Sequence, residues 1–431
     1  MNIIKIVRFL NDVFFEKKSL PPLAMREQLV DGWDFEDKRL TYSVLRHALP
    51  LSWFLDIRYP KWRKKIAVQH SAFGICALFV ALDQLIFGQK AIYYVNQWLS
   101  SALNKDLRVN WLTPIARAIL AQAPDESIFW SVIHDAAKKS DSWIAHLLED
   151  NPNLQLELMF SHPPLWISCK SLNLQKEISE IECANILSTD LGGSAIQLKK
   201  TTEYVQSLFE AGQISFQNIS SQRLRLILEK IEITPNNILD CCAAPGGKSI
   251  LLFNHYPNAN LTLTDLSLPR LLELKSNLIR VGIDNSTVQI EVLQHNWTTS
   301  STLLSNKSAK LKNFDLVLVD PPCSGSGVTR KHPDSLWKKH DNHSLEQTQA
   351  NILKNAASYV MPGGYLIYST CSINSNENEK QIGKFISENP SWTYIKVELA
   401  GLIQKEFGML QLMSSSADGM FFAVLQRKID A

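Results

Sequence analysis

Two short apolar runs in the second half of the sequence constrain the fold of this chain more than any other feature. One is Asp315-Leu-Val-Leu-Val-Asp-Pro-Pro-Cys323, and the other is Tyr365-Leu-Ile-Tyr-Ser-Thr-Cys371. Each is rich in β-branched and apolar residues and ends in polar residues and a cysteine, which is typical of buried strands in an α/β sheet. Chemistry in such sheets takes place at the carboxyl ends of the strands. We therefore expect Cys323 and Cys371 to lie at one edge of one sheet.

From residue 236 onward, apolar runs of strand length alternate with helical patterns. This alternation predicts an α/β fold with a doubly wound, mostly parallel sheet. The predicted strands are Ile238–Cys242, Leu261–Asp265, Val288–Leu293, Phe314–Asp320 and Tyr365–Thr370. A helix is predicted over residues 267–281, with Ser267 as its cap and its end before Gly282. A last strand over residues 421–426 is expected to be antiparallel, at the end of the sheet.

The sequence before residue 236 has two further patterns, and a chain of 431 residues is long enough for two or three domains. Residues 1–140 contain few glycines and carry apolar residues at helical spacing, which predicts an all-helical domain. The expected helices include residues 65–87, 91–103 and one that begins near Pro114. Residues 141–235 are interpreted as a connecting subdomain, in which Pro163-Pro164 precedes a strand. Residues 236–431 are the predicted catalytic domain.

Composition limits the classes of function. The chain is 45% hydrophobic and 20% charged, as in ordinary globular proteins, and its net charge of +2 supplies no overall attraction for nucleic acid. Binding of that kind therefore needs a local patch. One basic cluster has aromatic residues between its cations and comprises Arg58, Tyr59, Lys61, Trp62, Arg63, Lys64 and Lys65. The pattern fits either a solvated helix end or a patch of cations and stacking rings for an RNA backbone.

Several features bear on the cellular compartment. Charges interrupt the first ten residues and no small-residue cleavage site follows, so no signal peptide is expected. The apolar stretch Phe73–Phe87 contains Asp83 and is short for a membrane span, which favours a buried helix. The seven cysteines are odd in number and include no C-x-x-C pair. We therefore expect free thiols, no metal site and a cytoplasmic location.

The first predicted strand leads into the turn Cys242-Ala-Ala-Pro-Gly-Gly-Lys248. Small residues between a strand and a helix let a ligand approach the backbone and the helix N-terminus. The turn is not a Walker A loop, which requires glycine where Cys242 stands, and it is not G-x-G-x-x-G. Asp265 ends the second strand, near the spacing at which a carboxylate meets a ribose in nucleotide-binding folds. Together they suit an adenosine cofactor without a pyrophosphate, although Asp265 could instead cap the helix that follows.

Cysteines at two neighbouring strand ends are either inert buried thiols, the common role of cysteine, or groups that do covalent chemistry. The adjacent cofactor turn and Asp320 favour chemistry. A thiolate that adds to an electrophilic ring carbon makes the next carbon nucleophilic, which suits methylation at C5 of a pyrimidine. Asp320 is then expected to hold the base edge near N3 and N4 and to stabilise charge that develops in the ring.

Three motifs resemble the NOL1/NOP2/Sun family of RNA cytosine-5 methyltransferases, over residues 160–428. They are Cys242-Ala-Ala-Pro-Gly-Gly-Lys248, Asp320-Pro-Pro-Cys323-Ser-Gly-Ser-Gly, and Thr370-Cys371-Ser with Glu377-Asn-Glu379. The segment Arg330-Lys-His-Pro-Asp334, Trp337 and Asp418-Gly419 are similar to the bacterial 16S ribosomal RNA methyltransferase B subfamily. The helical N-terminal region is similar to the NusB-like RNA-binding domain of that subfamily. The resemblance implies a Rossmann-like methyltransferase fold behind a NusB-like domain.

The resemblance also implies what each residue does. S-adenosylmethionine is the implied methyl donor, Cys371 the residue that attacks C6 of cytosine, and Cys323 the residue that assists release by helping to remove the C5 proton. Asp320 would lie near both the donor and the base, and Asp265 would bind the ribose hydroxyls. The methionine end and ribose would be wrapped by Cys242, Ala243, Ala244, Pro245, Gly246, Gly247 and Lys248. The implied partner is RNA, specifically 16S ribosomal RNA, and we expect a monomer that needs neither metal nor membrane.

One position departs from the family pattern. After the third strand the family usually has Gly-Asp, whose carboxylate meets the adenine amine, whereas this chain has His295-Asn296. An asparagine carbonyl can accept the same hydrogen bond, so we expect weaker cofactor binding rather than none. Three alternatives stay open. They are an RNA-binding or ribosome-assembly protein with a vestigial methyltransferase domain, a family member that acts on another RNA such as tRNA, and a P-loop-like ATPase, which Cys242 disfavours.

Overall fold

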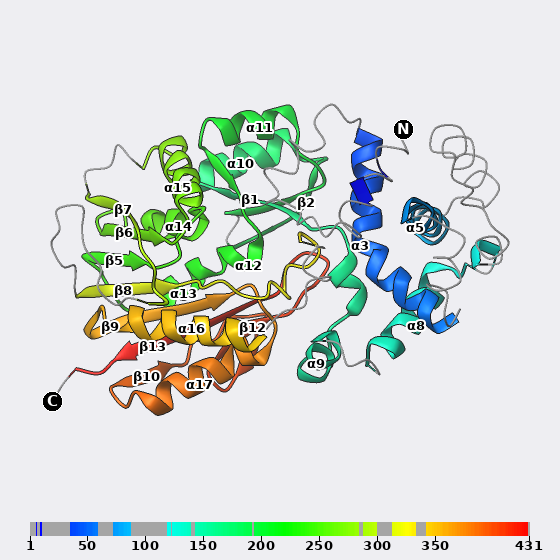
Figure 1. Ribbon diagram of the computed structural model, residues 1–431. Coiled ribbons are helices and arrows are strands. Elements are labelled where there is room, and N and C mark those ends of the chain that lie inside the picture. Colours follow the sequence, from blue (N-terminus) through cyan, green and yellow to red (C-terminus); the bar gives the residue numbers. More distant parts are fainter. Residues whose placement is uncertain are drawn as a thin grey trace. The chain divides into compact units, whose positions relative to one another are not determined.

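The structure is a computed structural model, and it describes residues 6, 9–10, 35–58, 72–87, 119–121, 123–138, 143–191, 194–283, 288–299, 313–332 and 342–429 (Figure 1). The chain divides into two compact units. One comprises Met1–His162 with Thr329–Lys338, and the other Pro163–Val328 with Lys339–Ala431. The division into domains at residues 140 and 235 remains a proposal.

The regular elements described in the first unit are all helices, which confirms the predicted helical character. They are α3 (Phe35–Arg58), α5 (Ala72–Ile86), α8 (Glu126–Lys138), α9 (Trp143–Asp150) and the 3₁₀ turn η1 (Leu156–Phe160). Helix α5 is apolar, and its side chains from Cys76 to Leu82 are buried, as expected for Phe73–Phe87. Its buried Asp83 lies 2.7 Å from His47 Nδ1.

Other predictions for this unit cannot be compared with the structure. The expected helices at 91–103 and near Pro114, together with Asp334 and Trp337, lie outside the described residues, apart from 119–121. Of the basic cluster, only the backbone of Arg58 is described. The likeness to a NusB-like domain stays a prediction. No helix among the described residues is both long enough and apolar enough to span a membrane.

The second unit begins with a small antiparallel sheet of order β2-β3-β1-β4. Its elements follow a βαββαβ sequence: β1 (Leu165–Cys169), α10 (Leu172–Ile181), β2 (Ile186–Asp190), β3 (Ala195–Leu198), α11 (Glu203–Glu210) and β4 (Ile214–Phe216). The strand predicted after Pro163-Pro164 is therefore confirmed. One face of the sheet packs against α10 and α11. On the other face, Trp166 packs with Ile219 and Ala417, and its Nε1 donates to Ser416 O at 2.6 Å.

The larger sheet has the order β11-β12-β13-β9-β8-β5-β6-β7. Its parallel part consists of β5 (Asn237–Asp240), β6 (Asn260–Asp265), β7 (Ile290–Gln294), β8 (Phe314–Val319) and β9 (Val360–Thr370). The antiparallel part consists of β10 (Trp392–Ile395), β11 (Ile403–Lys405), β12 (Gly408–Gln411) and β13 (Met420–Arg427). The Rossmann-like, mostly parallel arrangement of the predicted strands is confirmed.

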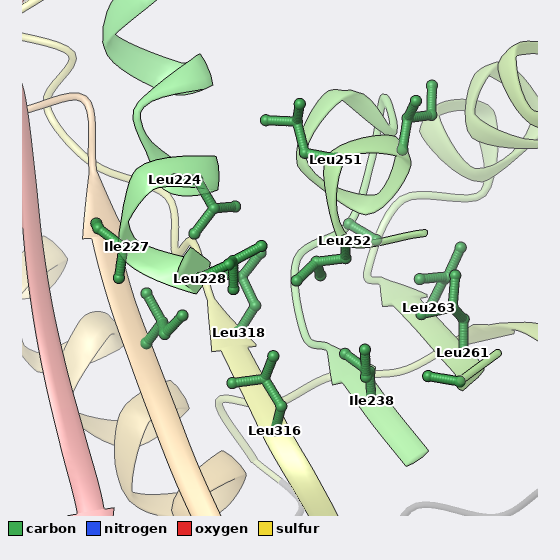
Figure 2. Packing of buried hydrophobic residues seen from close by; sticks show 14 of the residues in the cluster. Leu224, Ile227, Leu228, Ile238, Leu251, Leu252, Leu261, Leu263, Leu316 and Leu318 are labelled. Atoms are coloured by element: carbon green, nitrogen blue, oxygen red, sulfur yellow. The ribbon is translucent and has the colours of Figure 1, made fainter. Parts of the chain in front are cut away.

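Helices cover both faces of the parallel part. Their bounds are α12 (Ile219–Gln222), α13 (Leu224–Lys230), α14 (Gly247–His255), α15 (Leu268–Arg280), α16 (Asn342–Ala357) and α17 (Glu379–Glu388). Figure 2 shows leucines of α13 and α14 packed over Ile238, Leu316 and Leu318 of the sheet. Val317 and Val319 alternate with these residues, so they face the opposite side, where α16 packs on β8 and β9. Burial on both faces explains the continuous apolar runs in the sequence.

Two local expectations are corrected. The strand at 421–426 is antiparallel to β9 as expected, but it does not end the sheet, because β10 and β12 also pair with β13. Strands β10 to β12 have only three or four residues each, too few to give a clear pattern. Ser267 is the N-cap residue of α15, but its side chain makes no capping hydrogen bond.

Candidate active site

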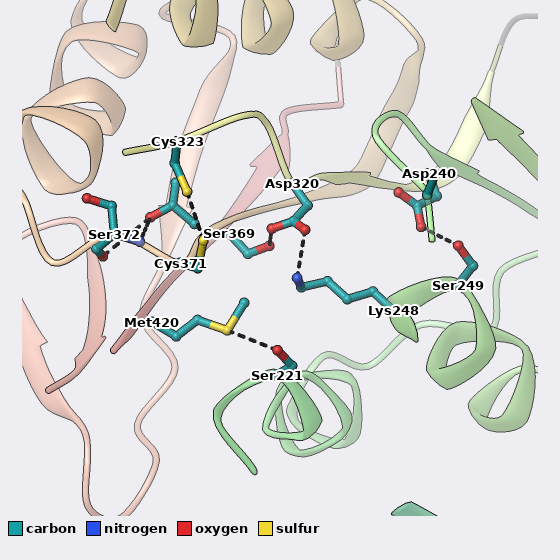
Figure 3. A network of polar contacts seen from close by, with 12 residues as sticks. Ser221, Asp240, Lys248, Ser249, Asp320, Cys323, Ser369, Cys371, Ser372 and Met420 are labelled. Atoms are coloured by element: carbon teal, nitrogen blue, oxygen red, sulfur yellow. Dashed lines mark hydrogen bonds and ion pairs between the residues drawn. The ribbon is translucent and has the colours of Figure 1, made fainter. Parts of the chain in front are cut away.

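The carboxyl ends of three adjacent strands lie along one edge of the sheet, because β8 pairs with both β5 and β9. Strand β5 ends at Asp240 and β8 at Val319, each slightly earlier than predicted, so Cys242 and Asp320 stand in the loops that follow. Figure 3 shows Lys248, Asp320, Cys323 and Cys371 gathered at this edge. Asp265 ends the next strand, β6, and Asn296 follows β7 beyond it.

The two cysteines lie in direct contact, with Cys323 Sγ and Cys371 Sγ 3.0 Å apart (Figure 3). Both are free thiols and half-buried. The hydrogen bond with Cys371, followed by burial, raises the pKa of Cys323 well above its ordinary value. Cys323 therefore keeps its proton at neutral pH and can donate it toward the neighbouring sulfur. The sequence prediction that these residues meet at one sheet edge agrees with this placement.

Asp320 is held by two donors. Its Oδ2 accepts from Lys248 Nζ at 2.7 Å, and its Oδ1 accepts from Ser369 Oγ at 2.8 Å (Figure 3). Burial opposes the charge on Lys248, but the Asp320 carboxylate outweighs it and raises the pKa of the lysine. Lys248 therefore stays protonated at neutral pH and donates to the Asp320 carboxylate. Asp320 stands in the loop after β8, beside the cysteines.

The turn over residues 242–248 is shaped by its small residues. Ala243 and Ala244 are buried, and the bond between Ala244 and Pro245 is cis. Gly246 has a φ of 107°, and an added Cβ would lie 2.7 Å from Leu274 Cδ1. This backbone conformation and this close packing both require glycine. The Arg270 guanidinium donates to Ala244 O, and Asn277 Nδ2 donates to Pro245 O at 2.9 Å, so α15 fixes the outer side of the turn.

Asp265 has one engaged oxygen and one that accepts no hydrogen bond. Oδ1 accepts from the backbone N–H of Ser267, the N-cap residue of α15, at 3.0 Å, which fixes the carboxylate at the start of that helix. Oδ2 is buried and lies 3.3 Å from Arg270 Nη1, an ion pair whose arginine is largely exposed, but it accepts no hydrogen bond. A buried acceptor in this state fits a ligand hydroxyl. The carboxylate can therefore be held by the chain through Oδ1 and still bind a ribose through Oδ2.

Asn296 is less available than expected. Its Oδ1 accepts from the Thr298 backbone N–H at 3.0 Å and from Thr298 Oγ1 at 2.6 Å. The carbonyl oxygen assigned to an adenine amine is therefore engaged in a local turn. Trp297 next to it is anchored by its Nε1, which donates to Thr264 Oγ1 at 2.8 Å. The cofactor role of Asn296 stays a prediction.

Two buried carboxyl groups near this edge, those of Asp240 and Glu377, were not among the predicted site residues. Burial raises the pKa of Asp240 to about 7, against the hydrogen bond from Ser249 Oγ, which lowers it. Glu377 lies in the 3₁₀ turn η4 (Ser375–Glu377), where it contacts the loops of both cysteines. The only signals in the sequence were the position of Asp240 at the end of an apolar strand and the place of Glu377 in a motif. Among the described residues, no cluster of His, Cys, Asp and Glu could hold a metal.

Comparisons with known proteins agree with this site. The family model "16S rRNA methyltransferase RsmB/F" matches residues 231–426, which include the 242–248 turn and both cysteines. The Ribosomal RNA small subunit methyltransferase B of Vibrio vulnificus (strain YJ016) is 30% identical over 325 residues, which cover 71% of this chain and 70% of that protein. The chain belongs to the RsmB/F methyltransferase family. The protein of that name from Enterobacter sp. (strain 638) is 33% identical over 275 residues, and the match spans only 60% of its length.

Solved structures share the fold of this family member. The crystal structure of PH0851 aligns with a TM-score of 0.64 at 21% identity and covers 99% of this chain and 98% of that one. NSun6 from Pyrococcus horikoshii, solved with SFG, aligns with a TM-score of 0.51 at 15% identity and covers 69% of this chain and 97% of that one. At these identities the likeness shows the fold alone.

Proposed function

We propose that this protein transfers a methyl group from S-adenosylmethionine to C5 of a cytosine in RNA, through a covalent adduct between Cys371 and C6. The observation that carries the proposal is the 3.0 Å contact between two free thiols beside the Asp320–Lys248 pair. Inert buried cysteines need no such neighbours, whereas a covalent cycle in which one thiol attacks and another assists release uses two thiols at one place. Membership of the RsmB/F family and the names of its relatives support 16S ribosomal RNA as the substrate.

The residues at this edge fit S-adenosylmethionine. The buried Oδ2 of Asp265 can accept from a ribose hydroxyl, and the turn over residues 242–248 offers backbone to the rest of the ligand. The cofactor has no pyrophosphate, which agrees with the lack of a Walker A or G-x-G-x-x-G sequence. When bound, S-adenosylmethionine supplies an electrophilic methyl group. The Asp320 carboxylate lies between this turn and the cysteines.

The chain's own groups account for the remaining chemistry. The Cys371 thiolate forms a bond to C6, and the electron pair of the C5–C6 double bond makes C5 the nucleophile. Asp320, fixed by Lys248 and Ser369, is placed to hold the base edge and to stabilise charge that develops in the ring. A cytosine inside folded RNA must first leave its stack to reach this edge.

Cys323 is assigned to the release step. After methylation the C5 proton must leave, and its electron pair re-forms the C5–C6 double bond as the bond between Cys371 and C6 breaks. Cys323 touches the Cys371 sulfur, and its raised pKa keeps it protonated at neutral pH. It must therefore first lose this proton to solvent, after which its strongly basic thiolate can accept the C5 proton. The two thiols thus act at different steps of one cycle.

Cysteine variants give the test. With labelled S-adenosylmethionine and 16S ribosomal RNA, Cys371→Ala should transfer no methyl group and form no covalent complex. Cys323→Ala should attack and methylate but fail to release, so that a protein–RNA complex survives on denaturing gels. Cys183→Ala, at an exposed cysteine away from this edge, is the matched control and should behave as wild type. A complex with Cys371→Ala and none with Cys323→Ala would exchange the two roles.

The remaining alternatives make different predictions in the same assay. A vestigial domain would bind RNA without transferring label in any variant. A family member with another target would label tRNA rather than 16S ribosomal RNA. Full activity in both cysteine variants would contradict the covalent mechanism and leave the cysteines as packing residues.

A further inference from the structure

Glu377 is a buried carboxylate, 2% exposed, that lies behind the two cysteines and accepts four hydrogen bonds. Its Oε1 accepts from Ser324 Oγ at 2.6 Å and from Ser372 Oγ at 2.7 Å. Its Oε2 accepts from the Ser324 backbone N–H at 2.8 Å and from Gln349 Nε2 at 2.9 Å. Hydrogen bonds to a carboxylate are strong, so four of them hold the Glu377 side chain and its four donor groups in fixed positions.

The donors belong to both cysteine loops. Ser324 follows Cys323 directly, and Ser372 follows Cys371 directly. Gln349 Nε2 also donates to Pro322 O at 3.0 Å, on the other side of Cys323. The loops after β8 and β9 are therefore joined through one side chain that touches neither sulfur.

The residue next to Glu377 completes the hold on Cys371. Asn378 Oδ1 accepts from Thr370 Oγ1 at 2.6 Å, and Asn378 Nδ2 donates to Ser372 O at 2.9 Å. The turn η4 is fixed in turn by Tyr368 OH, which donates to Glu377 O at 2.9 Å. Cys371 is thus held on both sides by residues of one short turn.

We propose that Glu377 is a positioning residue that sets the spacing of the Cys323 and Cys371 sulfurs for the two-step cycle, an inference that rests on the proposed function for its catalytic consequence. The reason is the number of acceptors. Four donors converge on two carboxylate oxygens, whereas glutamine offers one oxygen and a second group that is itself a donor. In Glu377→Gln, the oxygen can still accept from Ser324 N and Gln349 Nε2, but the two serine hydroxyls must turn to accept from the amide. All four bonds then lose a charged acceptor, which weakens the hold on both loops.

The test compares Glu377→Gln with Glu379→Gln in the full chain. Glu379→Gln makes the same change of charge two residues later, but the ion pair of Glu379 is with Lys405, at 3.6 Å, and not with a residue of the cysteine loops. Methyl transfer is measured first. Glu377→Gln should lower kcat by about 100-fold, the loss typical of an ångström-scale misplacement, with the KM for S-adenosylmethionine unchanged. Glu379→Gln should keep the wild-type kcat.

The second measurement is the rate at which Cys323 and Cys371 form a disulfide, which depends on the spacing of their sulfurs and requires no methyl transfer. Diamide oxidises two adjacent thiols to a disulfide. One thiolate adds to its N=N bond, the second thiolate attacks the bound sulfur and breaks the new S–N bond, and the reagent leaves as the hydrazine with two protons. The rate of formation of the Cys323–Cys371 disulfide should fall by about 10-fold or more in Glu377→Gln, because exchange depends on access of one sulfur to the other. Alkylation of the exposed Cys183 serves as the internal standard.

The two measurements separate the possible outcomes. A low kcat with a wild-type rate of disulfide formation would overturn the proposal, as would wild-type values of both. A third outcome is that the wild-type protein transfers no methyl group, while disulfide formation is slower in Glu377→Gln than in wild type. That result would uphold the spacing role and reject the proposed function. If Glu377→Gln does not fold, Gln349→Ala takes its place. It removes one of the four donors to Glu377, together with the bond to Pro322 O, and should lower both rates by a smaller factor. Wild-type rates in that variant would equally overturn the proposal.

Discussion

Asp240, at the carboxyl end of β5, is a carboxyl group that burial makes titrate near neutral pH. Burial raises the pKa of Asp240 from its ordinary 3.8 to about 7. Between these two values the folded protein binds a proton that the unfolded chain does not, so the free energy of unfolding should fall as pH rises through this window. The shift corresponds to a loss on the order of 4 kcal/mol across it.

Asp240→Asn should remove this pH dependence. The amide oxygen can still accept from Ser249 Oγ, and no charge has to be buried. The prediction is checked by urea unfolding at about pH 5 and about pH 8, where the variant should lose less stability than wild type as pH rises. Equal losses in the two proteins would mean that Asp240 does not titrate in this range.

Asp265 gives a second prediction at the residue scale. Asp265→Ala should weaken S-adenosylmethionine binding by about 1.5–3 kcal/mol, because a hydrogen bond to a charged acceptor is lost. Titration calorimetry measures this directly. The matched control is Asp315→Ala, whose Oδ2 also accepts backbone N–H groups, from Asn236 and Asn237, but at the opposite end of the strands. An unchanged affinity in folded Asp265→Ala would leave this carboxylate only its hydrogen bond with the Ser267 backbone.

At the scale of elements, the strands of the parallel sheet could be predicted because burial on both faces makes them continuous apolar runs. The meeting of Cys323, Cys371 and Asp320 followed from the rule that parallel strands end at one edge. The pairing of β13 with β10 and β12 could not be predicted, since it joins short strands with little pattern.

The hydrogen bonds within the site were beyond sequence reasoning for a different reason. The hold of Glu377 on two loops depends on side-chain directions set by residues from α16, β9 and η4 together. The engagement of Asn296 Oδ1 by Thr298 likewise depends on the local turn geometry after β7. A motif shows that such residues belong to the site, but it does not show which donors they meet.

The cysteine loops also pack backbone against backbone, and this yields an element-scale prediction. Gly419 N donates to Gly327 O at 2.7 Å, and Gly327 N donates to Cys371 O at 2.9 Å. An added Cβ on Gly419 would lie 2.5 Å from Ile373 Cγ2 and 2.7 Å from Gly327 Cα. Gly419→Ala should therefore push the loops apart, lower kcat and reduce the free energy of unfolding by about 1–3 kcal/mol.

Gly282→Ala separates steric conflict from backbone strain. Gly282 has a φ of +73°, but nothing lies within 4 Å of its added Cβ. That variant should lose about 1–2 kcal/mol of stability through the left-handed backbone alone and keep its kcat. Chemical unfolding and methyl transfer, measured on both variants, check the pair. A wild-type kcat in Gly419→Ala would show that the contact between these loops does not position the thiols.

At the scale of the whole molecule, the net charge of +2 leaves RNA affinity to local patches. The basic cluster over residues 58–65 is far in sequence from every motif of the proposed chemistry. If it binds the RNA backbone, it should contribute affinity and not rate, because it supplies phosphate contacts and no group that reaches the base. Its effect should then fall on the KM for RNA, with kcat nearly unchanged.

Charge reversal of Lys61, Arg63 and Lys64 tests this expectation. Each phosphate contact that is lost should reduce the slope of log K against log salt by about 0.7–0.9, so the three changes together should flatten it by about 2. Lys176→Glu, on the exposed face of α10, is the control for reversing a cation outside the cluster. Filter binding over a series of salt concentrations measures the slope, and initial rates give KM and kcat. A slope that stays the same as in the control would make the cluster a solvated helix end, and RNA would then have to be held by the methyltransferase unit itself.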